Sequence, residues 1–99
     1  MSLSNNQIRH LRGLAHALKP VVMVGQHGLK DSILTEVEIA LDAHELIKLK
    51  VSVGDREARD EIIQKIVDHA GAELVQRIGN TAVLFRRNTE KPRVALPSK

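Results

Sequence analysis

Between residues 20 and 53 the spacing of apolar side chains changes from that of a strand to that of a helix, and then back to that of a strand. This pattern limits the folds that the chain can adopt. Val21 to Val24 is a short apolar run, apolar side chains then recur at helical spacing, and residues 47–53 alternate between apolar and polar. The pattern predicts a strand, a helix from about Lys30 to Ala43, and a second strand from Glu45 to Val53. A strand-helix-strand unit of this kind has a right-handed crossover, and the crossover makes its two strands parallel.

A further helix is predicted before this unit. Ser4 and Gln7 have the spacing of a capping box, which predicts a helix from Asn5 to Leu18. Pro20 cannot continue the helical hydrogen bonds, so the helix should end before it. The strand that follows is apolar at all four positions, which is typical of a strand covered on both faces of a sheet.

A third helix and a hairpin are predicted after the unit. Asp55 can cap the helix and Gly71 can end it in a left-handed conformation. Gly79-Asn80 can then form a type II′ turn between strands at residues 72–78 and 81–87. We therefore expect an α/β fold with one compact domain, the order α-β-α-β-α-β-β, and a four-stranded mixed sheet with helices packed on it.

Composition sets the number of domains and excludes several classes of protein. With 99 residues and 42% apolar side chains, the chain can bury a single core. We expect a domain over residues 1–87 and a basic, flexible tail over residues 88–99, where no hydrophobic period is present. No cysteine is present, which fits a cytoplasmic protein. No apolar run approaches the roughly 20 residues of a membrane span, so no membrane partner is expected.

Charge is distributed unevenly along the chain. The formal net charge is +3, but residues 1–30 carry +4, residues 31–73 carry −6 and residues 74–99 carry +5. A protein that presents one face to a polyanion would show such segregation if its two ends meet in space.

Three groups of residues are candidates for binding a polyanion. The turn Gly25-Gln26-His27-Gly28 leads from a strand into a helix, where backbone N–H groups could hold a phosphate; a purely structural turn is the alternative. Four basic side chains share one stripe of the first helix, and four more follow the last strand, although a solvated helix face or a solubilising tail would look similar. Lys48 and Lys50 could extend this surface or face water. The predicted RNA-binding residues are Arg9, Arg12, His16, Lys19, Gly25, Gln26, His27, Gly28, Lys30, Arg86, Arg87, Lys91 and Arg93.

Catalysis has little support in the sequence. The five histidines form no metal-ligand pair, and there is no Cys nucleophile, nucleophile-elbow serine, GxGxxG or P-loop. We expect no catalytic residue, metal, cofactor or small-molecule substrate. Phe85 is the only aromatic residue, so a platform of stacked bases is unavailable, and recognition should depend on phosphates and RNA shape.

Longer motifs resemble those of a known family. The run from Leu18 to Leu29, followed by Ala40-Leu41 and by residues 44–48, resembles the CRM domain, and in particular its bacterial single-domain members of the YhbY type. The resemblance covers nearly the whole chain up to Arg87. It implies a fold similar to the C-terminal domain of translation initiation factor three, and a Gly-x-x-Gly loop that acts like that of KH domains.

The resemblance also implies a function. It implies RNA binding and association with precursors of the large ribosomal subunit, hence a role in ribosome maturation. Carried over by position, the loop is Gly25, Gln26, His27 and Gly28. Two departures stand out: the middle loop positions carry no fixed positive charge, and Lys30 stands where family members often have Thr.

The leading hypothesis is a non-enzymatic protein that binds ribosomal RNA in large-subunit precursors. The main alternative is a protein-interaction module that reaches the ribosome through a ribosomal protein. A third reading is a small enzyme or nucleotide-binding domain that uses the glycine loop. The RNA sequence, the strand order and the oligomeric state cannot be read from these patterns.

Overall fold

The computed structural model describes residues 3–98. Its helices and strands follow one another in the predicted order α-β-α-β-α-β-β within one α/β domain. They are α1 (Asn5–Ala15), β1 (Pro20–Val24), α2 (Asp31–His44), β2 (Leu46–Val51), α3 (Arg56–Ala70), β3 (Glu73–Ile78) and β4 (Thr81–Phe85).

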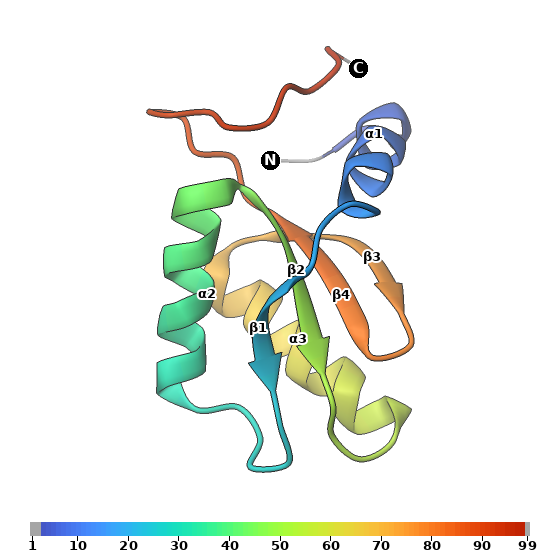
Figure 1. Cartoon of the computed structure of the whole chain (residues 1–99), viewed down its shortest axis with the longest axis vertical. Helices are drawn as coiled ribbons and strands as arrows, with labels where there is room; N and C mark the ends of the chain where they lie inside the picture. The colour runs from blue at the N-terminus through green and yellow to red at the C-terminus, as the bar shows by residue number, and fades with distance from the viewer. Residues whose placement is uncertain (1–2, 99) are drawn as a thin grey trace.

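The four strands form one mixed sheet, as the sequence predicted. The strand order is β1-β2-β4-β3, with β1 parallel to β2 and the other two pairs antiparallel (Figure 1). β4 therefore enters between β2 and β3, so β1 and β3 are the two edge strands. Strand order depends on contacts between distant segments, which local periodicity does not reveal.

The main core lies between the sheet and the two helices α2 and α3. Val22, Leu49 and Leu84 from three adjacent strands meet Val37 of α2 and Ile66 of α3, and all five side chains are buried. Alternate residues of each strand point to this face, because side chains of a strand alternate between its two sides.

The opposite face of the sheet is only partly covered. α1 packs there through Leu11 and Ala15, which contact Val75 of β3 and Phe85 of β4 in a second, smaller core. Figure 1 shows that α1 lies at one end of the sheet and leaves the rest of this face free.

The prediction that β1 is covered on both faces is wrong. Val22 and Val24 are buried, but Val21 and Met23 are 51% and 64% exposed. The reason is the strand order: β1 is an edge strand, while α1 packs against residues of the other three strands, Leu46, Val75 and Phe85 among them.

The ends of the helices follow the local signals with one difference. The capping box of Ser4 and Gln7 is present, and Gly71 ends α3 in the left-handed conformation. However, α1 ends at Ala15, three residues earlier than predicted. Residues 16–18 form a tighter turn in which the N–H of Leu18 donates to the carbonyl of Ala15, and Leu18 thereby reaches the second core.

The residues after β4 contact the domain along their length. The amide of Gln7 donates to the carbonyl oxygen of Pro97, and the ring of His10 bonds to the carbonyl of Ala95. Val94 and Leu96 pack against the second core. The domain boundary at residue 87 and the mobility of residues 88–98 in solution stay predictions; residue 99 lies outside the described residues.

Candidate nucleic-acid interface

The uncovered half of the sheet forms the centre of the candidate site. Met23 of β1 is paired with Lys50 of β2, and Pro20 with Lys48, so apolar and basic side chains alternate across this face. Lys19 enters β1 from the turn after α1 and is exposed. We call this surface, defined by Lys19, Met23, Lys48 and Lys50, the open face.

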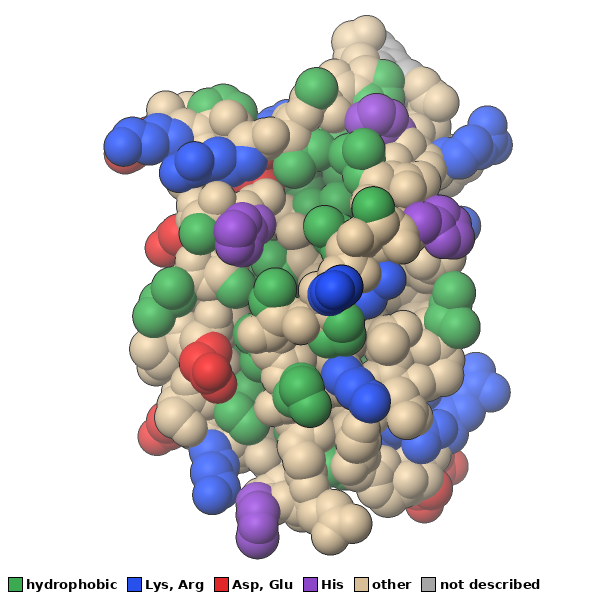
Figure 2. Space-filling view, viewed as in Figure 1, with side chains coloured by type: hydrophobic (Ala, Val, Ile, Leu, Met, Phe, Trp, Pro, Cys, Tyr) green, Lys and Arg blue, Asp and Glu red, His purple; other side chains and the backbone are tan. Residues whose placement is uncertain are grey.

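Acidic residues belong mainly to the other side of the sheet. Residues 3–30, 46–54 and 74–89 contain no Asp or Glu, whereas the two helices behind the sheet, α2 and α3, hold most of the carboxylates. Figure 2 looks onto the open face and shows Lys and Arg side chains over its middle and Asp and Glu side chains toward its margins. The sheet therefore separates a basic surface from an acidic layer.

The predicted basic stripe of α1 lies on the β3 side of the helix. Arg12 donates from Nε to the carbonyl of Val75 in β3 at 3.2 Å, while His10 bonds to Ala95 after β4. His10 and Arg12 are two residues apart, so their side chains point about 200° apart around the helix axis. The side of the helix that carries Arg9, Arg12 and His16 therefore faces away from the C-terminal residues. The structure thus brings Lys19 to the open face, whereas Arg12 lies at β3, the edge strand on the opposite side of the sheet from β1.

The glycine turn lies at the other end of the sheet. Gly28 donates its N–H to the carbonyl of Gly25 at 3.0 Å, which closes the turn, and Gly28 has a φ of 79°. Figure 1 shows the connection between β1 and α2 at the bottom, whereas α1 and the C-terminal segment lie at the top. The turn and Lys91 are therefore not brought together; the open face lies between them.

Two glycines of this turn have different structural roles. Gly28 needs its left-handed backbone, but Gly25 has no such φ, and a Cβ added at Gly25 would meet no atom within 4 Å. Lys30, the N-cap residue before α2, makes no side-chain cap hydrogen bond, and Gln26 and His27 are exposed. The fold therefore explains Gly28 and leaves the glycine at position 25 unexplained.

Arg86 and Arg87 are both engaged within the fold. Arg86 pairs with Glu38 and with Asp42, the latter at 2.9 Å, and donates to the carbonyl of Ala70 at 2.8 Å. Arg87 pairs with Glu45 at 3.1 Å and lies over the Phe85 ring. The predicted role of these arginines in RNA binding stays untested, and their contacts give them a structural role.

Glu45 is a polar residue whose role no local pattern of the sequence predicted. It lies between α2 and β2 with a φ of 63°, and it is fully buried. Its carboxylate accepts hydrogen bonds from the backbone N–H groups of Asn88, Arg93 and Val94 and from the side chain of Arg87. Burial by itself raises the pKa of this carboxyl, but the backbone and Arg87 hydrogen bonds outweigh it and hold the pKa below its ordinary value.

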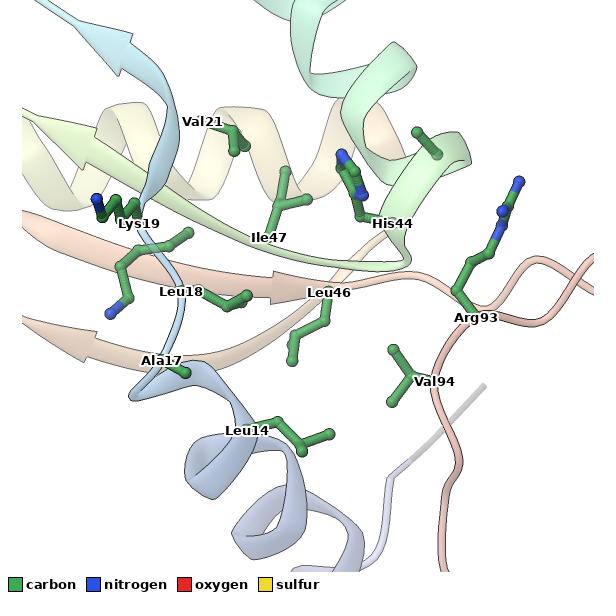
Figure 3. Close-up of a pocket in the computed structure, with 12 residues that line it drawn as sticks. Leu14, Ala17, Leu18, Lys19, Val21, His44, Leu46, Ile47, Arg93 and Val94 are labelled. Carbon is green, nitrogen blue, oxygen red and sulfur yellow. The ribbon is translucent and has the colours of Figure 1, made fainter.

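Glu45 fixes one border of a groove on the open-face side of the sheet. By binding the N–H groups of Arg93 and Val94, it holds both residues at a groove of about 620 Å³. Lys19 and Lys48 line the same groove (Figure 3). Sequence reasoning missed this groove because its borders come from three separate segments of the chain, residues 14–21, 43–48 and 93–94.

Residues 3–98 contain neither a cluster of metal ligands nor a membrane-spanning helix. No group of three or more His, Asp and Glu side chains within this range is arranged to hold a metal ion. None of the helices in the same range has the length and apolar content to cross a membrane.

Comparison with known proteins identifies relatives along almost the whole chain. A protein of Haemophilus influenzae named "RNA-binding protein" is 48% identical over 98 residues, which cover 99% of this chain and 98% of the relative. The Bacillus subtilis protein named "Probable RNA-binding protein YqeI" is 37% identical over 95 residues, covering 96% and 99% of the two chains.

The fold has a solved counterpart as well. The solution structure of the hypothetical protein SAV1595 from Staphylococcus aureus matches with a TM-score of 0.82 at 30% identity, covering 97% of this chain and all of that one. The family model of the CRS1 / YhbY (CRM) domain matches residues 3–86. This range contains all seven helices and strands, and the chain belongs to the CRS1 / YhbY (CRM) domain family.

Proposed function

We propose that this protein is a non-catalytic RNA-binding module that acts in the cytoplasm on ribosomal RNA within precursors of the large ribosomal subunit. The observation that carries the proposal is the open face, where Lys19, Lys48 and Lys50 lie on acid-free segments and the sheet keeps the carboxylates of α2 and α3 behind them. A phosphate backbone is the natural partner for such a surface, because Lys and Arg neutralise phosphates and release counterions.

The predicted contacts extend from the open face in two directions. At one end, Gly25 to Gly28 and Lys30 meet the start of α2, where a helix N-terminus favours an anion. At the other end, the α1 stripe and the exposed residues Lys91 and Arg93 flank the sheet. We assign Arg86 and Arg87 to support of this surface, since their guanidinium groups are held by carboxylates and backbone carbonyls.

The relatives support the class of ligand. The matched proteins from Haemophilus influenzae and Bacillus subtilis carry RNA-binding names over nearly their full lengths. Ribosomal RNA as the specific ligand rests on the resemblance to the bacterial single-domain members of the family. A protein partner on the ribosome is the alternative outcome.

A matched pair of double variants tests the open face. Lys48→Gln with Lys50→Gln removes two charges from the open face, and Arg56→Gln with Lys65→Gln removes two exposed charges from α3. We expect only the first to weaken binding of a structured RNA, by about tenfold or more, in a fluorescence anisotropy titration. The log-log salt slope of the first variant should also fall by about 1.4 to 1.8, because each lost phosphate contact removes about 0.7 on single strands and about 0.9 on a duplex. Equal losses in both variants would contradict the assignment.

Crosslinking in cells tests the identity of the RNA. Sequencing of the RNA crosslinked to the protein should recover large-subunit ribosomal RNA and its precursors. Recovery of unrelated RNA would contradict the ribosomal proposal and leave RNA binding in place. Co-sedimentation with ribosomal particles that survives complete nuclease digestion would instead indicate the protein partner.

A further inference from the structure

The groove beside the open face has an apolar interior and positive ends. Leu14, Leu18, Leu46 and Val94 contribute aliphatic side chains. Figure 3 shows these four side chains gathered around the hollow, with Lys19 at one end and Arg93 at the other. The groove is therefore suited to a ligand whose middle is apolar and whose two ends are negative.

An irregularity in β1 shapes the wall of this groove. The register between β1 and β2 shifts between Pro20 and Val22, so Val21 is an extra residue in the strand. Such a bulge redirects side chains and often lies beside a binding site. Val21 is 51% exposed and lines the groove, so an aliphatic side chain that could have been buried is presented to a ligand instead.

We propose that this groove binds one unpaired nucleotide of the RNA, with its base among the aliphatic side chains and its two flanking phosphates near Lys19 and Arg93. The proposal rests on the proposed RNA-binding function and adds to it a preference for RNA with a bulged or looped nucleotide. The volume of about 620 Å³ lies within the roughly 300–1,000 Å³ typical of small-ligand sites.

Charge complementarity favours a nucleotide over other apolar ligands. None of the twelve residues that line the groove is acidic, and Lys48 adds a third positive charge between its ends. A nucleotide within a chain has one phosphate on each side of its ribose, which provides an anion for the cation at each end of the groove. A fatty acid carries its charge at one end only, so Arg93 or Lys19 would be left without a partner.

Aliphatic side chains can replace the aromatic platform that this chain lacks. Enzymes that extrude bases hold them between apolar as well as aromatic side chains. Leu14 and Val21 are both exposed at the groove although each is hydrophobic. The sequence alone indicated that recognition should depend on phosphates and RNA shape, because aromatic residues are scarce. The groove instead offers aliphatic side chains for contact with a base.

Methyl NMR on the full chain tests this proposal directly. The protein is titrated with a short RNA hairpin that has one unpaired uridine in its stem, and in parallel with the same hairpin fully paired. We expect the unpaired uridine to shift the methyl signals of Leu14, Val21 and Val94, and the paired hairpin to leave them unchanged. The methyl signals of Ile39, which is exposed on α2 outside the groove, should not shift with either RNA.

A substitution that leaves the charge unchanged gives an independent test of the groove. Leu14→Gln should lower the affinity for the bulged hairpin about tenfold, the scale of one stacked base, without changing the affinity for the paired hairpin. Ile39→Gln is the matched control, since it replaces another exposed aliphatic residue on a helix and should change neither affinity. Circular dichroism confirms that both variants are folded.

The outcomes separate the two proposals. If both hairpins bind and neither shifts the methyl signals of the groove, the groove proposal is wrong and the proposed function stands. If neither hairpin binds, the proposed function fails as well. If a fatty acid or an acidic peptide shifts the groove methyls and the bulged hairpin does not, the groove belongs to that other ligand, and the nucleotide assignment is overturned.

Discussion

The carboxylate of Glu45 accepts a hydrogen bond from the backbone N–H of Val94 at 2.8 Å, across 49 residues of chain. Through this contact and those with Asn88 and Arg93, a buried charge at the start of β2 positions the segment after β4. That segment supplies one border of the groove and part of the basic surface. Glu45 therefore links the stability of the fold to the shape of the candidate site.

Glu45→Gln should lower the free energy of unfolding by about 2–4 kcal/mol, because the substitution removes charge-assisted hydrogen bonds and leaves Arg87 without its carboxylate partner. Urea unfolding measures this change. Trypsin should also cleave faster after Arg93, which Val94 follows. Glu90→Gln is the control, since Glu90 is an exposed acid in the same segment. Equal stability of the two variants would contradict the role given to Glu45.

The contribution of Glu45 to stability should depend on pH. Its pKa in the folded protein is lowered from the ordinary value of 4.5. A lowered pKa stabilises the fold above 4.5, and this stabilisation is lost as the pH falls through the folded value. The difference in unfolding free energy between the wild type and Glu45→Gln should therefore be largest at neutral pH and shrink below pH 4.5. Urea titrations across this range measure it; a constant difference would show that Glu45 does not titrate as proposed.

Arg86→Gln should affect stability more than RNA binding. The guanidinium group joins α2 to the end of α3 through Asp42 and the carbonyl of Ala70. We expect a loss of about 1–2 kcal/mol in urea unfolding, because these contacts are only partly buried. The affinity for RNA should change by less than about twofold in a variant that is still folded, whereas Lys48→Gln should show the reverse pattern. A large loss of affinity in Arg86→Gln would restore Arg86 as an RNA contact.

Gly25→Ala should separate folding from binding in the glycine turn. Residue 25 lacks a positive φ and has open space around its Cα, so alanine should change stability by less than about 0.5 kcal/mol. If an RNA backbone approaches this turn closely, the added methyl group should lower the affinity, which anisotropy titrations measure. Gly28→Ala is the comparison, since a φ of 79° makes alanine there cost about 1 kcal/mol of stability. Unchanged affinity in Gly25→Ala would remove the turn from the interface.

The helices and strands were predictable because their signals are local. The capping box at Ser4, the left-handed glycine at position 71 and the alternation within β2 each act within a few residues. The end of α1 was misplaced because Leu18 leaves the helix to pack against a core that includes residues of β2, β3 and β4. The strands β2 and β4 also end two residues earlier than predicted, at Val51 and Phe85.

The candidate site was less predictable than the fold. The exposure of Met23 depends on which strand lies beside β1, and the engagement of Arg86 depends on carboxylates 44 and 48 residues away. Periodicity gives the face on which a side chain lies, but it does not give the neighbour across the sheet. Glu45 appeared only as the first residue of a strand, although it organises the segment after β4.

By itself, the sequence determined the order of the elements, the Gly-x-x-Gly turn, and a division of charge in which the acids fall mostly on two helices. Tertiary structure alone decided that Lys48 and Lys50 lie on the side of the sheet away from those acids, and that Lys19 and Arg93 border one groove. The physical reason is that propensity and capping act between near neighbours in sequence. Strand order and ion pairing, in contrast, are settled only when distant segments compete for the same buried surface.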